Sequence, residues 1–209
     1  LCYVAPAFTQ PIQYIGKIGK YPVHMRLEFR GNKVSGGYYY DKHGIVLLLN
    51  GTSGKESIVL NERDENSQST GTFVGKVQGN EINGSWKQSP KAPPIAFKLT
   101  RDNNGNFSRN YVGTINNKYR VQMKLTRKGN DISGMYYYEK TGLDIPLRGI
   151  VNPDESVAID EYNNDGELQA SFIGKLTADF SLQGQWSKLN GKPMPFMLKV
   201  NTKQLRRAN

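Results

Sequence analysis

The chain has 209 residues, a single cysteine and a formal net charge of +10 at pH 7. One cysteine excludes an intrachain disulfide, and no apolar run approaches the roughly 20 residues of a membrane-spanning helix. The basic excess is uneven, because residues 14–100 carry 12 basic and 7 acidic side chains while residues 111–200 carry 11 and 10. No run of five basic residues and no nucleic-acid-binding motif occurs. We therefore interpret the charge as a solubilising surface and expect no specific nucleic-acid partner.

At the N-terminus, apolar residues lead into Ala5-Pro6-Ala7. A small-x-small pattern after apolar residues is typical of the end of a secretory signal. We interpret residues 1–13 as an N-terminal segment that includes a signal-peptide remnant, and we predict a secreted or periplasmic protein. Two alternatives stay open: a lipidated Cys2, although Leu1 stands where a small residue is expected, and an apolar terminus without a targeting role.

One phrase occurs twice along the chain, as GNKVSGGYYYDKHG at residues 31–44 and as GNDISGMYYYEKTG at residues 129–142. The likeness extends well beyond it, since TFVGKVQGNEINGSW at 72–86 matches SFIGKLTADFSLQGQW at 171–186. A fixed repeat of this length indicates a duplicated structural unit. We predict these segments: repeat 1 at 14–100, a polar linker rich in glycine and asparagine at 101–110, repeat 2 at 111–200 and a basic C-terminal tail at 201–209.

The apolar residues within each copy recur every second position. Val23, Met25 and Leu27 alternate with polar residues in the first copy, and the stretch VQMKLT at 121–126 does the same in the second. This period is typical of strands with one buried and one wet face. About eight short strands a copy, with a turn signal every 8–12 residues, predict an all-β chain. We expect two tandem antiparallel up-and-down β-barrels, because closure removes exposed sheet edges.

Glycines recur on the predicted inner face. Gly36, Gly75 and Gly84 have counterparts in the second copy, and each lies two residues from an aromatic side chain. Glycine weakens a strand unless the backbone bends or a neighbour lies over it. We therefore expect tight curvature, with aromatic rings covering the glycines.

The order of short phrases resembles a known kind of domain. G-x-Y-Y-Y is followed by F-x-G-K, G-x-W and F-x-L in both copies. This order resembles the tandem small β-barrel repeats of uncharacterised exported bacterial proteins, and its architecture is similar to avidin and lipocalin-like barrels. The avidin resemblance does not extend to biotin, because each copy has one tryptophan where an avidin site uses several. A more distant resemblance is to small β-barrel inhibitors of lysozyme.

The chain offers little for catalysis or metal binding. Its two histidines, His24 and His43, and the terminal Cys2 do not supply a usual zinc site. No nucleophile elbow and no phosphate-binding glycine loop occurs. We predict a protein that is not an enzyme and has no cofactor.

Two glutamates share the parity of the buried residues before them: Glu62 follows Ile58 and Leu60, and Glu161 follows Val157 and Ile159. An inward carboxylate is unfavourable unless it is hydrogen-bonded, and inward tyrosines can donate those bonds. The functional interpretation is the polar floor of a ligand pocket; the structural one is a carboxylate near solvent at a strand end, bonded to a turn or an arginine. The candidate pocket residues are Tyr38, Tyr40, Glu62, Trp86, Tyr136, Tyr138, Glu161 and Trp186.

Tyr39 and Tyr137 have the opposite parity and should point away from the core. Exposed tyrosines suit contacts with glycans or proteins, because the ring is apolar and the hydroxyl polar. The alternatives are cross-strand packing on the wet face and burial between the two copies.

A barrel of about 90 residues should be filled by its own side chains. We therefore favour an exported binding protein that acts through barrel surfaces or the joint between domains, with a protein or glycan partner. One alternative is a carrier of a small apolar ligand inside the barrels, and another is an inhibitor of a secreted hydrolase. Both a monomer and a dimer stay open.

Overall fold

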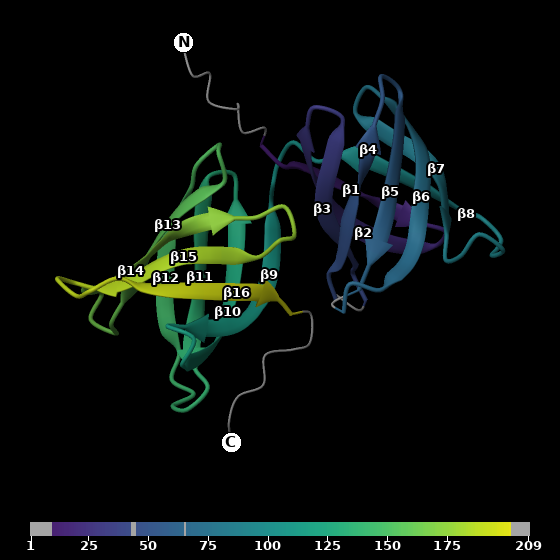
Figure 1. The fold of residues 1–209 in the computed structure, drawn as a ribbon. Coiled ribbons are helices and arrows are strands. Elements are labelled where there is room, and N and C mark those ends of the chain that lie inside the picture. The colour runs from purple at the N-terminus through teal and green to yellow at the C-terminus, as the bar shows by residue number, and fades with distance from the viewer. Residues whose placement is uncertain (1–9, 43–44, 65, 202–209) are drawn as a thin grey trace, which may run out of the picture. The chain divides into compact units, whose positions relative to one another are not determined.

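The computed structural model describes residues 10–42, 45–64 and 66–201. These residues form strands and turns, and the strands close into two antiparallel barrels of eight strands each (Figure 1). The predicted fold class, two tandem up-and-down β-barrels, is confirmed. The expectations for Cys2, Ala5–Ala7, His43 and the basic tail fall outside the described residues. Within the described ranges, no helix is long and apolar enough to cross a membrane.

The first barrel follows the chain strand by strand. Each strand pairs with the next, and β1 pairs with β8 to close the sheet. Its strands are β1 (Ile12–Ile18), β2 (Tyr21–Arg30), β3 (Lys33–Tyr40), β4 (Leu47–Ser53), β5 (Ser57–Arg63), β6 (Ser69–Gln78), β7 (Glu81–Lys87) and β8 (Ile95–Arg101).

The second barrel repeats this order and closes through a pairing of β9 with β16. β9 begins at Phe107, so the last four residues of the predicted linker 101–110 already belong to this barrel. Its strands are β9 (Phe107–Ile115), β10 (Tyr119–Lys128), β11 (Asp131–Tyr138), β12 (Ile145–Val151), β13 (Ser156–Tyr162), β14 (Leu168–Leu176), β15 (Leu182–Lys188) and β16 (Met194–Val200).

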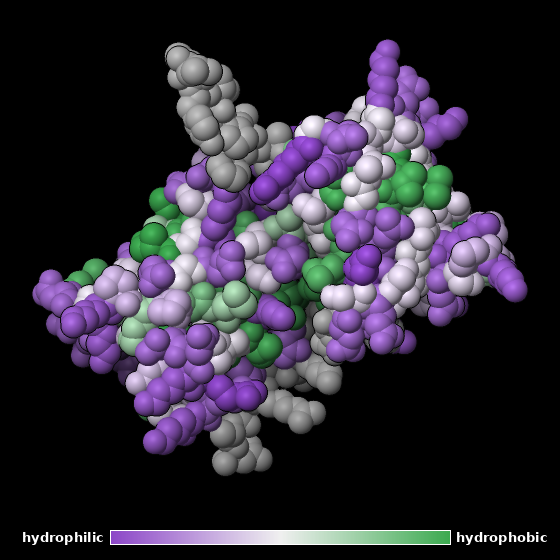
Figure 2. Space-filling model, viewed as in Figure 1, coloured by the Kyte–Doolittle hydropathy of each residue, from purple (hydrophilic) through white to green (hydrophobic). Residues whose placement is uncertain are grey.

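The alternating apolar residues form the barrel interiors. Val121, Met123 and Leu125 on β10 are all buried in one core cluster. Gln122 and Lys124 lie between them and point to the other face, as the period of two requires. On the face of the molecule in Figure 2, hydrophilic residues cover much of the surface, and hydrophobic residues lie in separate patches. Each barrel is therefore a sheet with one apolar inner face and one mostly polar outer face.

The repeated glycines mark places where strands approach closely. A Cβ on Gly84 would lie 2.1 Å from the backbone oxygen of Val74, and one on Gly184 would lie 2.1 Å from that of Ile173. The expectation of rings over the glycines holds at Gly75, where a Cβ would lie 2.9 Å from the Phe97 ring. At Gly84 and Gly184 the close neighbour is instead the backbone of the adjacent strand.

Candidate functional site

In the first barrel, three of the four predicted pocket residues meet at one oxygen atom. Tyr38 donates a hydrogen bond of 2.6 Å to Oε2 of Glu62, and the Trp86 indole donates one of 2.7 Å to the same atom. Glu62 is only 3 % exposed. The carboxylate therefore points into the barrel and is held by Tyr38 and Trp86, rather than bonding a turn or an arginine near solvent.

The second barrel contains the same arrangement. Tyr136 donates a 2.6 Å hydrogen bond to Oε2 of Glu161, and the Trp186 indole donates a longer one of 3.3 Å to the same oxygen. The hydroxyls of Tyr136 and Tyr138 lie 3.4 Å apart. Within the described residues, Oε1 of Glu161 accepts no hydrogen bond. This carboxylate is therefore held through one oxygen, while the described residues donate no hydrogen bond to the other.

A phenylalanine supports each of these tyrosine–glutamate–tryptophan clusters. The Phe172 ring contacts Tyr136 at 5.3 Å and Phe196 at 5.1 Å between centroids, and Trp186 at 6.5 Å. Phe73 makes the corresponding contacts in the first barrel, to Tyr38, Trp86 and Phe97. Edge-to-face packing of this kind fixes ring orientation, so the tyrosine and tryptophan donors are held in place around the carboxylate.

Tyr40 and Tyr138 are the fourth residues of the two predicted sets. Tyr40 is partly buried at the end of β3. The Tyr138 ring packs on Tyr136 at 5.5 Å and on Tyr119 at 6.3 Å between centroids.

A pocket of about 590 Å³ lies at one end of the second barrel. β10 begins here, β11, β13 and β15 end here, and β16 begins here, so five strands contribute to its wall. The predicted residues Tyr138, Glu161 and Trp186 lie in its lining. The rest of the lining consists of Tyr119, Lys188, Gly191, Lys192 and Met194. We call this pocket the open end of the second barrel.

Sequence reasoning missed the rim of this pocket. Lys188 and Lys192 flank the β15–β16 turn, which closes with a 2.8 Å hydrogen bond from the Gly191 amide to the Lys188 carbonyl. The available signal was the difference between the copies, because lysines occur at these positions only in the second one. The sequence also contained a signal for Tyr119, because a tyrosine, Tyr21, occurs at the matching position of the first copy.

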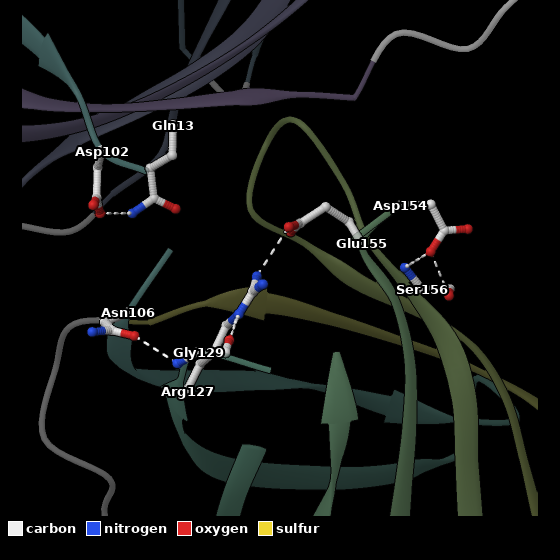
Figure 3. Close-up of polar contacts among 8 residues, drawn as sticks. All are labelled: Gln13, Asp102, Asn106, Arg127, Gly129, Asp154, Glu155 and Ser156. Atoms are coloured by element: carbon white, nitrogen blue, oxygen red, sulfur yellow. Dashed lines mark hydrogen bonds and ion pairs between the residues drawn. The ribbon is translucent and has the colours of Figure 1, made fainter. Parts of the chain in front are cut away.

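Polar contacts tie together the loops at the opposite end of the second barrel (Figure 3). Arg127 forms a 2.9 Å ion pair with Glu155 and donates a 2.7 Å hydrogen bond to the carbonyl of Gly129. The Gly129 amide in turn donates to the side chain of Asn106 at 2.8 Å. These contacts hold the β10–β11 turn against the strand that enters the barrel.

The residue that pairs with the glutamate and lies beside the tryptophan differs between the two copies. Gly71 pairs with Glu62, and a Cβ there would lie 2.4 Å from the indole nitrogen of Trp86. The matching residue in the second copy is Ala170, which pairs with Glu161. The methyl group of Ala170 occupies space that Trp86 uses in the first barrel, which accounts for the longer indole–carboxylate bond in the second.

Burial and hydrogen bonding to Glu161 raise the pKa of the Tyr136 hydroxyl above its ordinary value of 10.0. Burial also raises the pKa of Tyr138. Both hydroxyls therefore keep their protons at physiological pH, and Tyr136 acts as a donor to the carboxylate.

The raised pKa of Tyr136 predicts alkaline sensitivity. Well below pH 10 the hydroxyl is protonated in both states, so its contribution to stability is complete. As the pH rises through 10 the unfolded chain loses this proton while the folded barrel keeps it, so the free energy of unfolding should fall, with a slope that approaches about 1.4 kcal/mol per pH unit. Urea unfolding between about pH 9 and about pH 11 measures this slope. Tyr136→Phe should flatten it, and an unchanged slope in that variant would contradict the assignment.

Tyr39 and Tyr137 are not exposed as expected, since only 7 % and 3 % of these residues is accessible. Tyr137 donates a 2.9 Å hydrogen bond to Gln122 on the neighbouring strand, and Gln122 donates one of 3.1 Å to Glu139. This matches the alternative of cross-strand packing for Tyr137. A partner contact through either tyrosine stays a prediction.

His24 is partly buried on β2 rather than fully at the surface. Among the described residues, no three His, Cys, Asp or Glu side chains form a group that could hold a metal ion.

Comparisons with known proteins add little to this picture. Neither a protein-family model nor a curated protein matches the chain. Among solved structures, the chain is similar to the Myxococcus xanthus hemagglutinin, crystallised in complex with a3,a6-mannopentaose. That match has 12 % identity, covers 92 % of this chain and 89 % of the hemagglutinin, and has a TM-score of 0.23. A score this low carries no argument about function.

Proposed function

We propose that this protein is an exported, non-enzymatic binding protein that takes a carbohydrate at the open end of its second barrel. The observation that carries the proposal is the pocket in which Tyr119, Tyr138 and Trp186 surround Glu161. Small-ligand sites combine apolar and aromatic walls with a few placed polar groups, and this pocket has that composition.

The chemistry of the pocket suits a sugar ring. Sugars have faces of C–H groups that pack on aromatic rings, and hydroxyls that need acceptors. The aromatic walls can pack against the C–H face of the sugar. Oε1 of Glu161, to which the described residues donate no hydrogen bond, can accept one from a sugar hydroxyl. Because Tyr136 and Trp186 fix the other oxygen, the acceptor does not need to be ordered when the ligand binds.

Binding fits this site better than hydrolysis. Glycosidases use a pair of carboxylates on either side of the scissile bond. Among the described residues that line the pocket, Glu161 is the one carboxylate. Its Oε2 accepts hydrogen bonds from Tyr136 and Trp186, so the contacts that this carboxylate makes are those of an acceptor.

The pocket also favours a polar ligand over the alternative of an apolar cargo inside the barrel. Phe172, Phe196 and Leu198 fill the interior of the second barrel with side chains. The free space lies at the mouth, where Glu161 and two lysines contribute charge. Inhibition of a secreted hydrolase has no specific contact in its support and stays an alternative.

Binding of a panel of methyl glycosides, measured by isothermal titration calorimetry, tests the proposal. Glu161→Gln should weaken binding of the best glycoside by about tenfold or more, because a hydrogen bond to a charged group contributes roughly 1.5–3 kcal/mol. The matched control is Glu62→Gln, which alters the same cluster in the first barrel and should leave the affinity unchanged. A panel in which no glycoside binds, or equal losses in both variants, would refute the proposal.

A further inference from the structure

Two lysines stand at the rim of the open end, while the carboxylate lies deeper. We infer that the carbohydrate is an acidic one, with its ring against the aromatic residues and its anionic group between Lys188 and Lys192. This inference rests on the proposed function and adds the substrate class. It follows from the positions of the lysines, from their lack of partners and from the comparison between the two copies.

The positions follow from the strand and its turn. Lys188 is the last residue of β15 and lies two residues after Trp186, so both belong to the same face of the strand. Lys192 comes directly after the tight turn that the Gly191 amide closes. Both side chains line the pocket that Trp186 and Glu161 also line.

The charges of these lysines are available. Among the described residues, neither Lys188 nor Lys192 forms an ion pair or a side-chain hydrogen bond. Lys98 shows the contrast, since it forms a 2.8 Å ion pair with Glu81 on the outside of the first barrel. A cation left without a partner beside an apolar pocket attracts an anionic group on a ligand.

The two copies differ at these positions. Counted from the tryptophan, the first copy has Gln88 where the second has Lys188; counted back from the phenylalanine of the next strand, it has Pro93 where the second has Lys192. The tyrosine–glutamate–tryptophan cluster is common to both copies and so serves the barrel itself. Lysines at these two positions occur only in the second copy, beside the pocket, whereas the matching turn of the first copy carries Lys87 and Lys91.

The positions of the charged groups, with the lysines at the rim and Glu161 deeper in the pocket, set the orientation of the ligand. An acidic sugar can direct hydroxyls inward to Glu161 and its anionic group outward to the lysines. The reverse orientation would bring two negative charges together at Glu161. A neutral sugar would keep the inner contacts and lose the outer ones, whereas an amino sugar would meet like charge at the rim.

Sugars that differ at one carbon provide the test. The probes are methyl glucoside and methyl glucuronide, methyl galactoside and methyl galacturonide, and the 6-sulfate of each neutral sugar, measured by calorimetry. An acidic member should bind about tenfold or more tightly than its neutral partner, and this advantage should shrink as salt rises from about 50 to about 500 mM. A preference for the uronate identifies a carboxylate as the anionic group, and a preference for the sulfate identifies a sulfate ester.

Lysine variants distinguish a direct contact between the rim lysines and the sugar from attraction by the overall positive charge. Lys188→Gln with Lys192→Gln should abolish the advantage of the acidic sugar, so that the acidic and the neutral sugar bind with similar affinity. Lys175→Gln with Lys199→Gln removes the same charge from exposed positions on the outside of this barrel, and should change neither affinity. Equal losses in the two double variants would overturn the inference, because the attraction would then be a long-range field.

The outcomes also distinguish this inference from the proposal beneath it. Acidic and neutral sugars that bind equally, both with sensitivity to Glu161→Gln, would overturn the acidic class and leave carbohydrate binding in place. If no sugar of either kind bound, the proposed function would fail, and the inference with it.

Discussion

Replacing Phe172 by alanine is expected to lower the free energy of unfolding of the second barrel by about 3–5 kcal/mol, more than any other single change considered. Phe172 is completely buried, and its ring contacts those of Tyr136, Trp186 and Phe196. Truncation would remove apolar area and leave a cavity that the closed strands cannot easily collapse. It would also release Tyr136 and Trp186, the two donors that hold Glu161.

Each barrel has one tryptophan, so fluorescence can report the second barrel alone when Trp86 is replaced by phenylalanine. In that background, urea unfolding of the Phe172→Ala variant should show a lower midpoint with an unchanged slope. The matched control is Ile173→Ala, one residue along the same strand with its side chain on the outside, where 55 % of the residue is exposed. It should change stability by less than about 1 kcal/mol. Equal effects of the two variants would contradict the core position of Phe172.

Much of the fold could be predicted because one rule, the alternation of faces along a strand, operates throughout the chain. The alternation at Val121, Met123 and Leu125 predicted which residues of β10 are buried. The same parity made an inward position one of two interpretations for Glu62 and Glu161, and the structure shows both bonded to a tyrosine and a tryptophan. The duplication supported this interpretation, because a glutamate with the same parity occurs at the matching position of both copies.

Parity could not predict the rim of the open end. It assigns a side chain to a face but does not say which end of a barrel is open, since that depends on how the turns pack. Tyr119, Lys188 and Met194 come from three different strands and approach one another only through closure of the barrel. Parity also failed to predict the burial of Tyr39 and Tyr137, because an outward direction does not determine what covers a side chain.

The two copies show why the tyrosine–glutamate–tryptophan cluster alone does not define a binding site. Both barrels contain it, and in the first barrel the carboxylate is almost fully buried. There the cluster satisfies a polar group that would otherwise be unfavourable inside the barrel. In the second barrel the same cluster borders a pocket, with a longer bond to Trp186 and two added lysines. The same structural element is thus part of the interior of one barrel and borders a pocket in the other.

Gly184→Ala is the second substitution with a large expected effect, a loss of about 3 kcal/mol in the free energy of unfolding of the second barrel. An added Cβ would lie 2.1 Å from the backbone oxygen of Ile173 and 2.5 Å from the Cα of Gly174. Both atoms belong to β14, so no side chain can rotate away to make room. The strands would have to separate, and in a closed barrel each is also held by its other neighbour.

The same single-tryptophan assay measures this effect, with Gln183→Ala as the control. Gln183 precedes Gly184 on β15 and is exposed on the outer face, so its truncation should change stability by less than about 0.5 kcal/mol. Because Trp186 lies two residues farther along the same strand, Gly184→Ala should also disturb the bond from the indole to Glu161 and weaken ligand binding. If the alanine variant were as stable as the parent, β14 and β15 would have room to move apart, and close packing of strands could not be the reason for the repeated glycines.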